Sequence, residues 1–249
     1  MRLDIYLTES GLVPTRSRAK LLIDDGSVFV NGISVEKAAY DVKEEDTVTV
    51  ENALRYVSRG GLKLEAALRE FSVSPAGMVA LDVGASSGGF TDCLLQNGAR
   101  LVYAVDAGSG QLAASLRNDP RVDCRENYNA RYMKATDFSV PPAMAVMDVS
   151  FISQTLILPA LADVLSAGSR LISLVKPQFE VGRAFVGRGG LVRDEKARQA
   201  AILRVKEAGI ACGFRFLGVI TSPITGGDGN IEYLICFEKL DEKKVQEID

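Results

Sequence analysis

The sequence contains no histidine, and this absence limits the chemistry that it can support. Acid–base catalysis near neutral pH must instead use a lysine, a carboxylate or a tyrosine. The four cysteines, Cys93, Cys124, Cys212 and Cys236, are scattered, and no two of them form a CxxC pair. With neither histidines nor paired cysteines, no metal site is expected, and the thiols are expected to stay reduced, as in a cytoplasmic protein.

Long apolar runs and a strong charge imbalance are also lacking. No stretch reaches the ~18 apolar residues of a membrane span, and the opening MRLDIYLTESG introduces charge too early for a signal peptide. A cytoplasmic protein without a membrane partner is therefore expected. The net charge is −3, so any binding to nucleic acid requires a local basic patch. The 249 residues suffice for one large domain, or for a large and a small one.

The first fifty residues predict a small domain of mixed helix and strand. The segment TRSRAKLLIDDG has the apolar spacing of a helix, with Thr15 as its N-cap and Gly26 as its C-terminal stop. The next stretch, SVFVNGISV, predicts a hairpin that turns at Asn31 and Gly32. The alternation in DTVTVEN predicts a further strand.

Three basic residues, Arg16, Arg18 and Lys20, lie on the predicted helix opposite its apolar side. From charge alone, a solvated helix face and an RNA-binding surface are about equally good interpretations. The order of helix, glycine, strand and VNG turn resembles the S4-type RNA-binding domain, in which the helix arginines and the hairpin dock on folded RNA. By this resemblance the three residues bind RNA, and the domain covers residues 1–52, with a linker over 53–61.

From Met78 onward the pattern becomes an alternation of strands and helices. Strands are expected at MVALDV, RLVYAVD, RVDCR, MAVMDVSF, SRLISLVK, FRFLGVI and EYLICFE. Helices are expected at GGFTDCLLQNG, GQLAASLRN, ISQTLILPALADVLS and DEKARQAAILRVKEAG, and a further one follows a double glycine at 60–61. Seven strands with interleaved helices predict a doubly wound α/β sheet. The loop between the last two strands predicts a terminal antiparallel hairpin, and this domain is expected over residues 62–241.

The segment LDVGASSGGFTDCLL predicts a strand, a glycine-rich turn and a helix. Glycines let the backbone approach a ligand, and the start of the helix offers free amides. Asp106 ends the next strand, about twenty residues on, where a carboxylate can accept both hydroxyls of a ribose. Apart from simple turn formation, this arrangement serves either a dinucleotide or S-adenosylmethionine.

Three features favour S-adenosylmethionine. The glycine spacing is GxxxGG rather than GxGxxG, Asp82 precedes it on the strand in a position suited to the methionine ammonium, and the sheet is expected to end in an antiparallel strand. Glu126 or Asn127, after the third strand, is expected near the adenine. The residues expected to contact the cofactor are Asp82, Gly84, Ser87, Gly88, Gly89, Phe90, Asp106, Glu126 and Asn127.

Two charged residues, Asp148 in MAVMDVSF and Lys176 in LISLVKPQFEVG, are predicted at strand ends. Ligands bind outside the carboxyl ends of the strands in open α/β sheets, so both residues are expected to face the reacting groups. A structural ion pair is one interpretation. In the other, a half-buried lysine near other cationic groups loses its proton near neutrality and acts as a general base. A ribose 2′-hydroxyl requires such help because it is a poor nucleophile.

The motifs SRGGLKL, LDVGASSGGFTDCLL, MDVSFIS, LVKPQFEVG and GNIEYL together resemble the hemolysin A/TlyA family of ribosomal RNA 2′-O-methyltransferases, over essentially the whole chain. Members join an S4-type domain to an FtsJ/RrmJ-like catalytic domain, a class I S-adenosylmethionine-dependent methyltransferase with a Rossmann-like seven-stranded sheet. The resemblance implies a catalytic set of Lys63, Asp148, Lys176 and Glu232. In that set Lys176 is the base for the 2′-hydroxyl, Asp148 and Lys63 orient it, and Glu232 holds the lysines.

The resemblance also implies the substrate, a cytidine of ribosomal RNA, either free or in a ribosomal subunit. Longer family members modify both subunits, and shorter ones, whose outline this chain resembles, modify only the large one. Three alternatives are an RNA-binding protein without catalysis, a membrane-active hemolysin and an NAD-linked dehydrogenase. The intact catalytic set opposes the first alternative, and the lack of a membrane-spanning segment opposes the second. The glycine spacing and the S4-like segment oppose the third. Neither the target nucleotide nor the oligomeric state is predicted.

Overall fold

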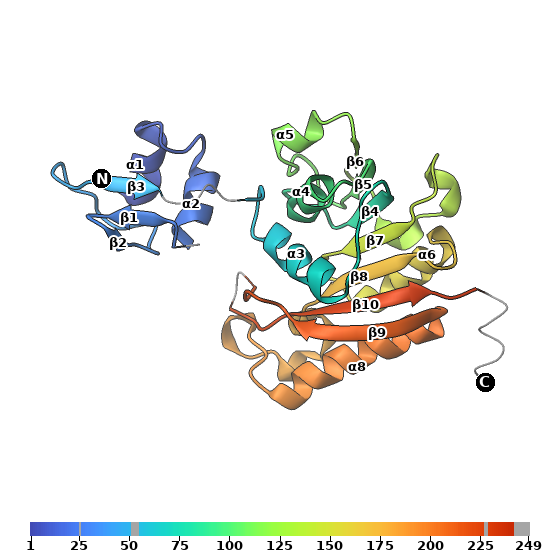
Figure 1. The fold of residues 1–249 in the computed structure, drawn as a ribbon. Coiled ribbons are helices and arrows are strands. Elements are labelled where there is room, and N and C mark those ends of the chain that lie inside the picture. The colour runs from blue at the N-terminus through green and yellow to red at the C-terminus, as the bar shows by residue number, and fades with distance from the viewer. Residues whose placement is uncertain (25, 51–54, 227–228, 242–249) are drawn as a thin grey trace. The chain divides into compact units, whose positions relative to one another are not determined.

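The protein forms two compact units, Met1–Arg59 and Gly60–Asp249, in the computed structural model (Figure 1). The structure describes residues 1–24, 26–50, 55–226 and 229–241. The boundary between the units falls inside the linker expected over 53–61, whose first two residues lie outside the described ranges. Its last two residues, Gly60 and Gly61, begin the first helix of the second unit.

The N-terminal unit consists of two helices and a three-stranded antiparallel sheet in the order β2-β1-β3. Helices α1 and α2 pack on each other, and the fully buried side chains of Leu3, Leu7 and Ile23 belong to their common core. The elements are α1 (Leu3–Glu9), α2 (Arg16–Asp24), β1 (Val28–Val30), β2 (Ile33–Ser34) and β3 (Val48–Val50).

The turn chemistry of this unit is the predicted one. The Thr15 hydroxyl accepts a hydrogen bond from the Arg18 amide at 3.2 Å, and Gly26 leaves α2 with φ +74°. Asn31 and Gly32 both have positive φ, as a type I′ hairpin turn requires. Helix α1 was not predicted, because seven residues are too few to show a helical period. The strand expected at DTVTVEN covers Val48–Val50, and its last two residues lie outside the described ranges.

The second unit is built on a seven-stranded sheet in the order β6-β5-β4-β7-β8-β10-β9 (Figure 1). All neighbours pair in parallel except β10, which runs antiparallel to both β8 and β9. The predicted doubly wound sheet with a terminal antiparallel hairpin is therefore confirmed. The strands are β4 (Val79–Val83), β5 (Leu101–Val105), β6 (Val122–Arg125), β7 (Met144–Met147), β8 (Arg170–Val175), β9 (Phe214–Thr221) and β10 (Tyr233–Lys239).

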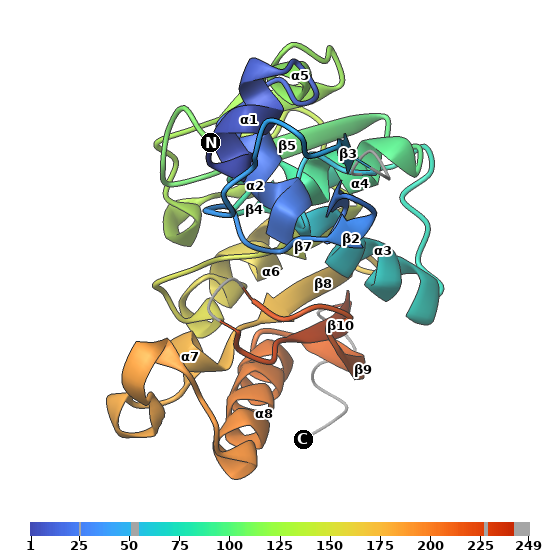
Figure 2. The same ribbon diagram turned by 90° about the vertical axis from the view of Figure 1, so that its left-hand side faces the viewer.

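Helices surround this sheet. Helix α8 lies along β9 and beside α7 (Figures 1 and 2), and α3 packs against α4. Apolar side chains of β4, β7, β8 and β10 are fully buried, which fixes the strand ends that carry the site. The helices are α3 (Gly60–Glu70), α4 (Gly89–Gln96), α5 (Ala114–Arg117), α6 (Leu158–Val164), α7 (Pro177–Glu180) and α8 (Glu195–Ala211).

Three predicted elements are shorter than expected. The helix over 152–166 divides into a 3₁₀ turn and α6, because Pro159 suits the first turn of a helix and not its interior. The helix over 110–118 is reduced to α5. The strand over 144–151 ends at Met147, so Asp148 begins a loop in which Phe151 has φ +63°.

Candidate active site at the carboxyl edge of the sheet

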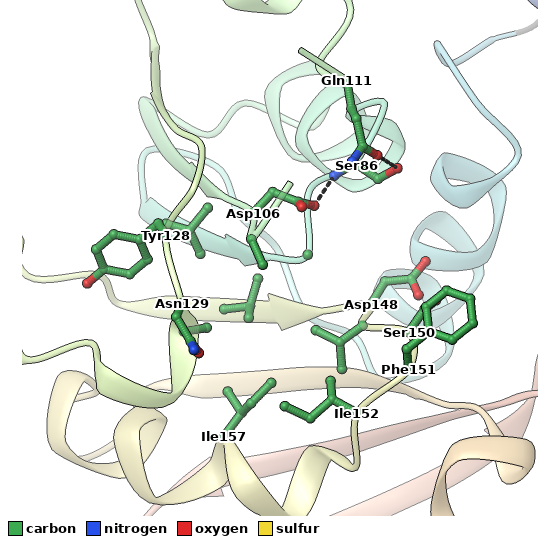
Figure 3. A pocket seen from close by; sticks show the side chains of 16 residues that line it. Ser86, Asp106, Gln111, Tyr128, Asn129, Asp148, Ser150, Phe151, Ile152 and Ile157 are labelled. Atoms are coloured by element: carbon green, nitrogen blue, oxygen red, sulfur yellow. Dashed lines mark hydrogen bonds between the residues drawn. The ribbon is translucent and has the colours of Figure 1, made fainter. Parts of the chain in front are cut away.

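A pocket of about 350 Å³ opens where β4, β5 and β7 end. This volume lies in the range of small-molecule sites. Figure 3 shows Asp106, Ser86 and Gln111 on one side and Asp148, Ser150 and Phe151 on another, with Tyr128 and Asn129 across from them. The further lining residues are Val83, Gly84, Val105, Ala107, Ala130, Val149, Ile152 and Ile157.

The glycine loop after β4 approaches the neighbouring strand end closely. Gly84 has φ +84°, and a Cβ atom at this position would collide with the carbonyl group of Asp148. Gly88 has φ +96° and forms the N-cap of α4, where a Cβ atom would meet the side chains of Leu112 and Leu116. Both positions therefore require glycine for conformation and for space.

Asp106 lies in the pocket wall at the end of β5, as predicted. Its carboxylate accepts hydrogen bonds from the amides of Ser86 and Gly108 at 2.8 and 2.7 Å. Gln111, which the sequence did not indicate, bonds the Ser86 hydroxyl at 3.1 Å and completes this side of the wall (Figure 3). A carboxylate has about four lone-pair sites, so Asp106 retains acceptor capacity for a ribose.

Asp82 lies behind the loop and outside the pocket wall. Its side chain is fully buried, and one carboxylate oxygen accepts a 2.6 Å hydrogen bond from the Thr91 hydroxyl of α4. The other oxygen has no hydrogen-bond partner among the residues that the structure describes. Burial raises the pKa of Asp82 to about 7, and the nearby Asp148 and Asp106 carboxylates act in the same direction. This carboxyl group therefore changes charge within the physiological pH range.

Four further residues of the predicted cofactor site lie outside the pocket wall. Ser87 accepts a hydrogen bond from the Ala113 amide at its carbonyl. Gly88 and Gly89 begin α4, and the Phe90 side chain is 3% exposed and packs inside the protein. None of these four residues lines the pocket, whereas Gly84 does.

The residues that line the pocket after β6 come slightly later in the chain than Glu126 and Asn127, which were expected near the adenine. Glu126 is held by Arg117 at 2.6 Å, and Asn127 is an exposed residue with φ +55°. The next residues, Tyr128 and Asn129, reach the pocket instead. The left-handed conformation at Asn127 redirects the chain there, and the only hint in the sequence is that asparagine tolerates it.

Lys176 and Asp148 meet at the mouth of the pocket. The Lys176 ammonium is 2.6 Å from Asp148 Oδ1 and donates a 2.8 Å hydrogen bond to the Ser150 hydroxyl. The two side chains are 13% and 22% exposed, so the pair is partly desolvated but open to a substrate. The placement of both at strand ends agrees with the prediction, and of the two only Asp148 lines the pocket.

Lys63 and Glu232 form a second ion pair, with 2.5 Å between Nζ and Oε2. The two side chains are only 10% and 3% exposed. Lys63 comes from α3, and Glu232 directly precedes β10. A Cβ atom at Gly226 would press on the Glu232 carboxylate, so that loop also fits closely around the pair. The structure therefore brings the four residues expected to act together into two pairs.

The three basic residues of α2 differ in their contacts within the N-terminal unit. Arg16 forms a 2.8 Å ion pair with the buried Asp4 and remains 62% exposed. Arg18 donates to the Tyr56 carbonyl at 3.2 Å. The Lys20 side chain is exposed. The two arginines therefore support their own domain, and RNA binding by the three residues stays a prediction.

The part of the chain that the structure describes offers neither a metal site nor a membrane span. No cluster of three or more histidine, cysteine, aspartate or glutamate side chains there could hold a metal ion. Within the same residues, no helix has both the length and the apolar character needed to cross a membrane.

Relatives of this chain share both of its units. A Brachyspira hyodysenteriae protein named hemolysin A is 44% identical over 95% of this chain and 99% of its own length. A Mycobacterium tuberculosis protein named 16S/23S rRNA (cytidine-2′-O)-methyltransferase TlyA is 42% identical over 94% and 88%. A solved hemolysin-type structure from Streptococcus thermophilus superposes with a TM-score of 0.77 at 46% identity, covering 97% of this chain and 89% of that one.

Family models divide the chain in the same way. The model of the S4 domain matches residues 1–48, and the model of the FtsJ-like methyltransferase matches residues 56–239. A solved S-adenosylmethionine-dependent methyltransferase from Listeria monocytogenes shares the fold, with a TM-score of 0.53 at 15% identity. The chain therefore belongs to the hemolysin A/TlyA family, in which an S4 domain is joined to an FtsJ-like methyltransferase.

Proposed function

We propose that this protein transfers a methyl group from S-adenosylmethionine to the ribose 2′-hydroxyl of a cytidine in ribosomal RNA. The Asp148–Lys176 pair beside the pocket carries this proposal, because a lysine amine held by a carboxylate is suited to accept the proton of a hydroxyl group. The ribosomal RNA substrate is supported by the name of the TlyA relative and by the S4 domain.

The pocket fits S-adenosylmethionine by its chemistry. Gly84 provides a cradle that a Cβ atom would fill, and Asp106 retains acceptor capacity for ribose hydroxyls. The Asp106 carboxylate, which forms no ion pair with a described residue, lies in the pocket wall and suits a cationic ligand. When bound, S-adenosylmethionine supplies an electrophilic methyl group. Tyr128 and Asn129 are then candidates for the adenine end of the site.

Asp148, Ser150 and Lys176 have different roles toward the RNA hydroxyl. Asp148 and Ser150 fix the position of Lys176 Nζ, and the neutral amine of Lys176 accepts the 2′-hydroxyl proton. The buried Lys63–Glu232 pair holds α3 against the start of β10, and through them it supports the site.

The domain limits remain part of this proposal: residues 1–52 choose and bind the RNA, and residues 62–241 perform the chemistry. The S4 domain binds phosphates through Arg16, Arg18 and Lys20. RNA of the large ribosomal subunit is the first substrate to test, since a Campylobacter jejuni relative, 32% identical over 96% of this chain and 100% of its own length, is named 23S rRNA (cytidine-2′-O)-methyltransferase TlyA.

The decisive experiment locates the transferred methyl group. Ribosomal particles and naked rRNA of both subunits are incubated with the protein and tritiated S-adenosylmethionine, and the RNA is digested to nucleosides. Label in 2′-O-methylcytidine from large-subunit RNA is expected, and Lys176→Met should abolish it. Label on a base, or on no RNA at all, would contradict the proposal.

A further inference from the structure

Helix α7 directly follows the lysine of the site and is fastened to the loop that carries its carboxylate partner. Lys176 is the N-cap of α7, and Glu180 is the last residue of that helix. Asp148 belongs to the loop after β7, here called the 148–154 loop. A shift of α7 relative to this loop would therefore change the distance between Lys176 and Asp148.

Glu180 connects α7 to the 148–154 loop through two hydrogen bonds in the protein interior. Its side chain is 2% exposed, and its two oxygens accept hydrogen bonds from the Ser153 hydroxyl at 2.6 Å and from the Gln154 amide at 2.8 Å. Burial raises the pKa of Glu180, while these two hydrogen bonds oppose the rise. A buried carboxylate is costly unless it is hydrogen-bonded, so the contact strongly favours one position of the loop.

Gln154 extends the fastening to the sheet. Its side chain is 1% exposed, donates to the Leu174 carbonyl at 2.5 Å and accepts from the Ser173 hydroxyl at 2.6 Å. Both partners lie on β8, two and three residues before Lys176. On the other side, Arg204 of α8 donates to the Glu180 carbonyl at 2.9 Å. The residues held by this network therefore lie on both sides of Lys176 in the chain, Ser173 and Leu174 before it and Glu180 after it.

The loop between these contacts is held in a strained conformation. Phe151 has φ +63°, is 92% exposed and packs its ring 5.2 Å from that of Phe179 on α7. A non-glycine residue keeps such a conformation only where surrounding contacts impose it. The Glu180 bonds lie two and three residues beyond Phe151 and provide such contacts.

We propose that Glu180 is a positioning residue for methyl transfer. It fixes the 148–154 loop on α7, so that Asp148 and Ser150 hold the Lys176 amine at the mouth of the pocket. Glu180 does not line the pocket and touches no substrate. This role rests on the proposed function and adds a residue that acts only through Lys176 and its partners. A displacement of about 1 Å at a reacting group costs about 10²-fold in rate, which sets the scale of the expected effect.

The test compares Glu180→Gln, Ser153→Ala and the double variant. Glutamine keeps the volume but replaces two hydrogen bonds to a charged carboxylate by weaker bonds to a neutral amide. With saturating S-adenosylmethionine and rRNA, kcat should fall about 10–100-fold in Glu180→Gln and about 3–10-fold in Ser153→Ala. The fall in the double variant should be less than the product of the two single effects, because both changes affect the Ser153–Glu180 hydrogen bond, although Ser153→Ala also removes bonds to Thr155. The KM for rRNA and the calorimetric affinity for S-adenosylmethionine should change less than about threefold.

Glu207→Gln, which removes an exposed carboxylate from α8, is the matched control and should retain wild-type kcat. A group that only stabilises the fold would lower the melting temperature and leave kcat unchanged in assays well below it. That result in Glu180→Gln, or in Ser153→Ala if the first variant does not fold, overturns the positioning role. A wild-type protein that methylates no RNA would instead overturn the proposed function, and the positioning role with it.

Discussion

Lys63 and Glu232 lie 169 positions apart in the chain, yet their charged atoms are 2.5 Å apart in a nearly fully buried ion pair. Lys63 is on α3, before the first strand of the sheet, and Glu232 directly precedes its last strand. The pair therefore joins the beginning and the end of the methyltransferase unit. A charge buried in this way is tolerated only while its partner is present.

Replacing one partner should therefore destabilise the protein more than replacing both. Glu232→Leu leaves the Lys63 ammonium buried without its partner and should lower the free energy of unfolding by about 3–5 kcal/mol. The double variant Lys63→Met/Glu232→Leu removes the buried charge altogether and should recover much of this loss. Urea unfolding of the two variants and the wild type measures the difference. Equal stability of the single and double variants would show that the pair is solvated in solution.

The sequence predicted the positions of Asp106, Asp148 and Lys176 because strand ends are visible in it. Alternating or continuous apolar runs mark the strands, and parallel strands bring their carboxyl ends to one edge. The pairing of Lys63 with Glu232 has no such local signal. It depends on the packing of α3 and the final hairpin, and only the family resemblance indicated it.

The parts of the site that the sequence did not reveal depend on the path of loops. Tyr128 and Asn129 enter the pocket because Asn127 adopts φ +55°. Asp82 stands before the glycine loop in the sequence, but its side chain leaves β4 toward α4, where it is buried and accepts a hydrogen bond from Thr91. Residue type alone fixes neither the left-handed conformation of Asn127 nor the partner of the Asp82 carboxylate.

Asp82 should make the stability of the protein depend on pH. Its pKa rises from 3.8 to about 7 in the folded protein, so between these values the folded state keeps a proton that the unfolded chain has lost. The stabilisation is complete below pH 3.8, declines as pH rises, and is lost above about 7. The free energy of unfolding of Asp82→Asn, taken relative to that of the wild type, should therefore be about 2–3 kcal/mol higher at pH 8 than at pH 5. Urea unfolding at both pH values checks this, and a constant difference would contradict it.

Asp106→Ala should weaken the binding of S-adenosylmethionine about tenfold or more. The substitution removes the proposed ribose acceptor, and a hydrogen bond to a charged group contributes about 1.5–3 kcal/mol. Isothermal titration calorimetry measures the affinity, with Glu44→Gln in the other unit as a control that removes an exposed negative charge. Unchanged affinity would reject this placement of the ribose. Binding of NADH in place of S-adenosylmethionine would reject the cofactor.

The basic residues of α2 should determine how RNA binding depends on salt. Replacing Arg16, Arg18 or Lys20 by Gln should reduce the slope of log affinity against log salt by roughly one unit per lost phosphate contact. Lys20→Gln should do so at little cost in stability, whereas Arg18→Gln also loses the bond to the Tyr56 carbonyl. The affinity for S-adenosylmethionine should not change. A triple variant with the wild-type salt slope would remove this face from the RNA-binding surface.

Lys176→Met should retain the fold and the affinity for S-adenosylmethionine, because methionine keeps the apolar stem and the proposed cofactor contacts lie elsewhere. Methyl transfer should fall about 10²–10⁴-fold, the usual scale for the loss of a general base. Lys176→Arg should be nearly as slow, since a guanidinium keeps the ion pair with Asp148 but cannot accept a proton. Near-normal single-turnover rates for the arginine variant would reduce Lys176 to an electrostatic clamp and would make Asp148 the base.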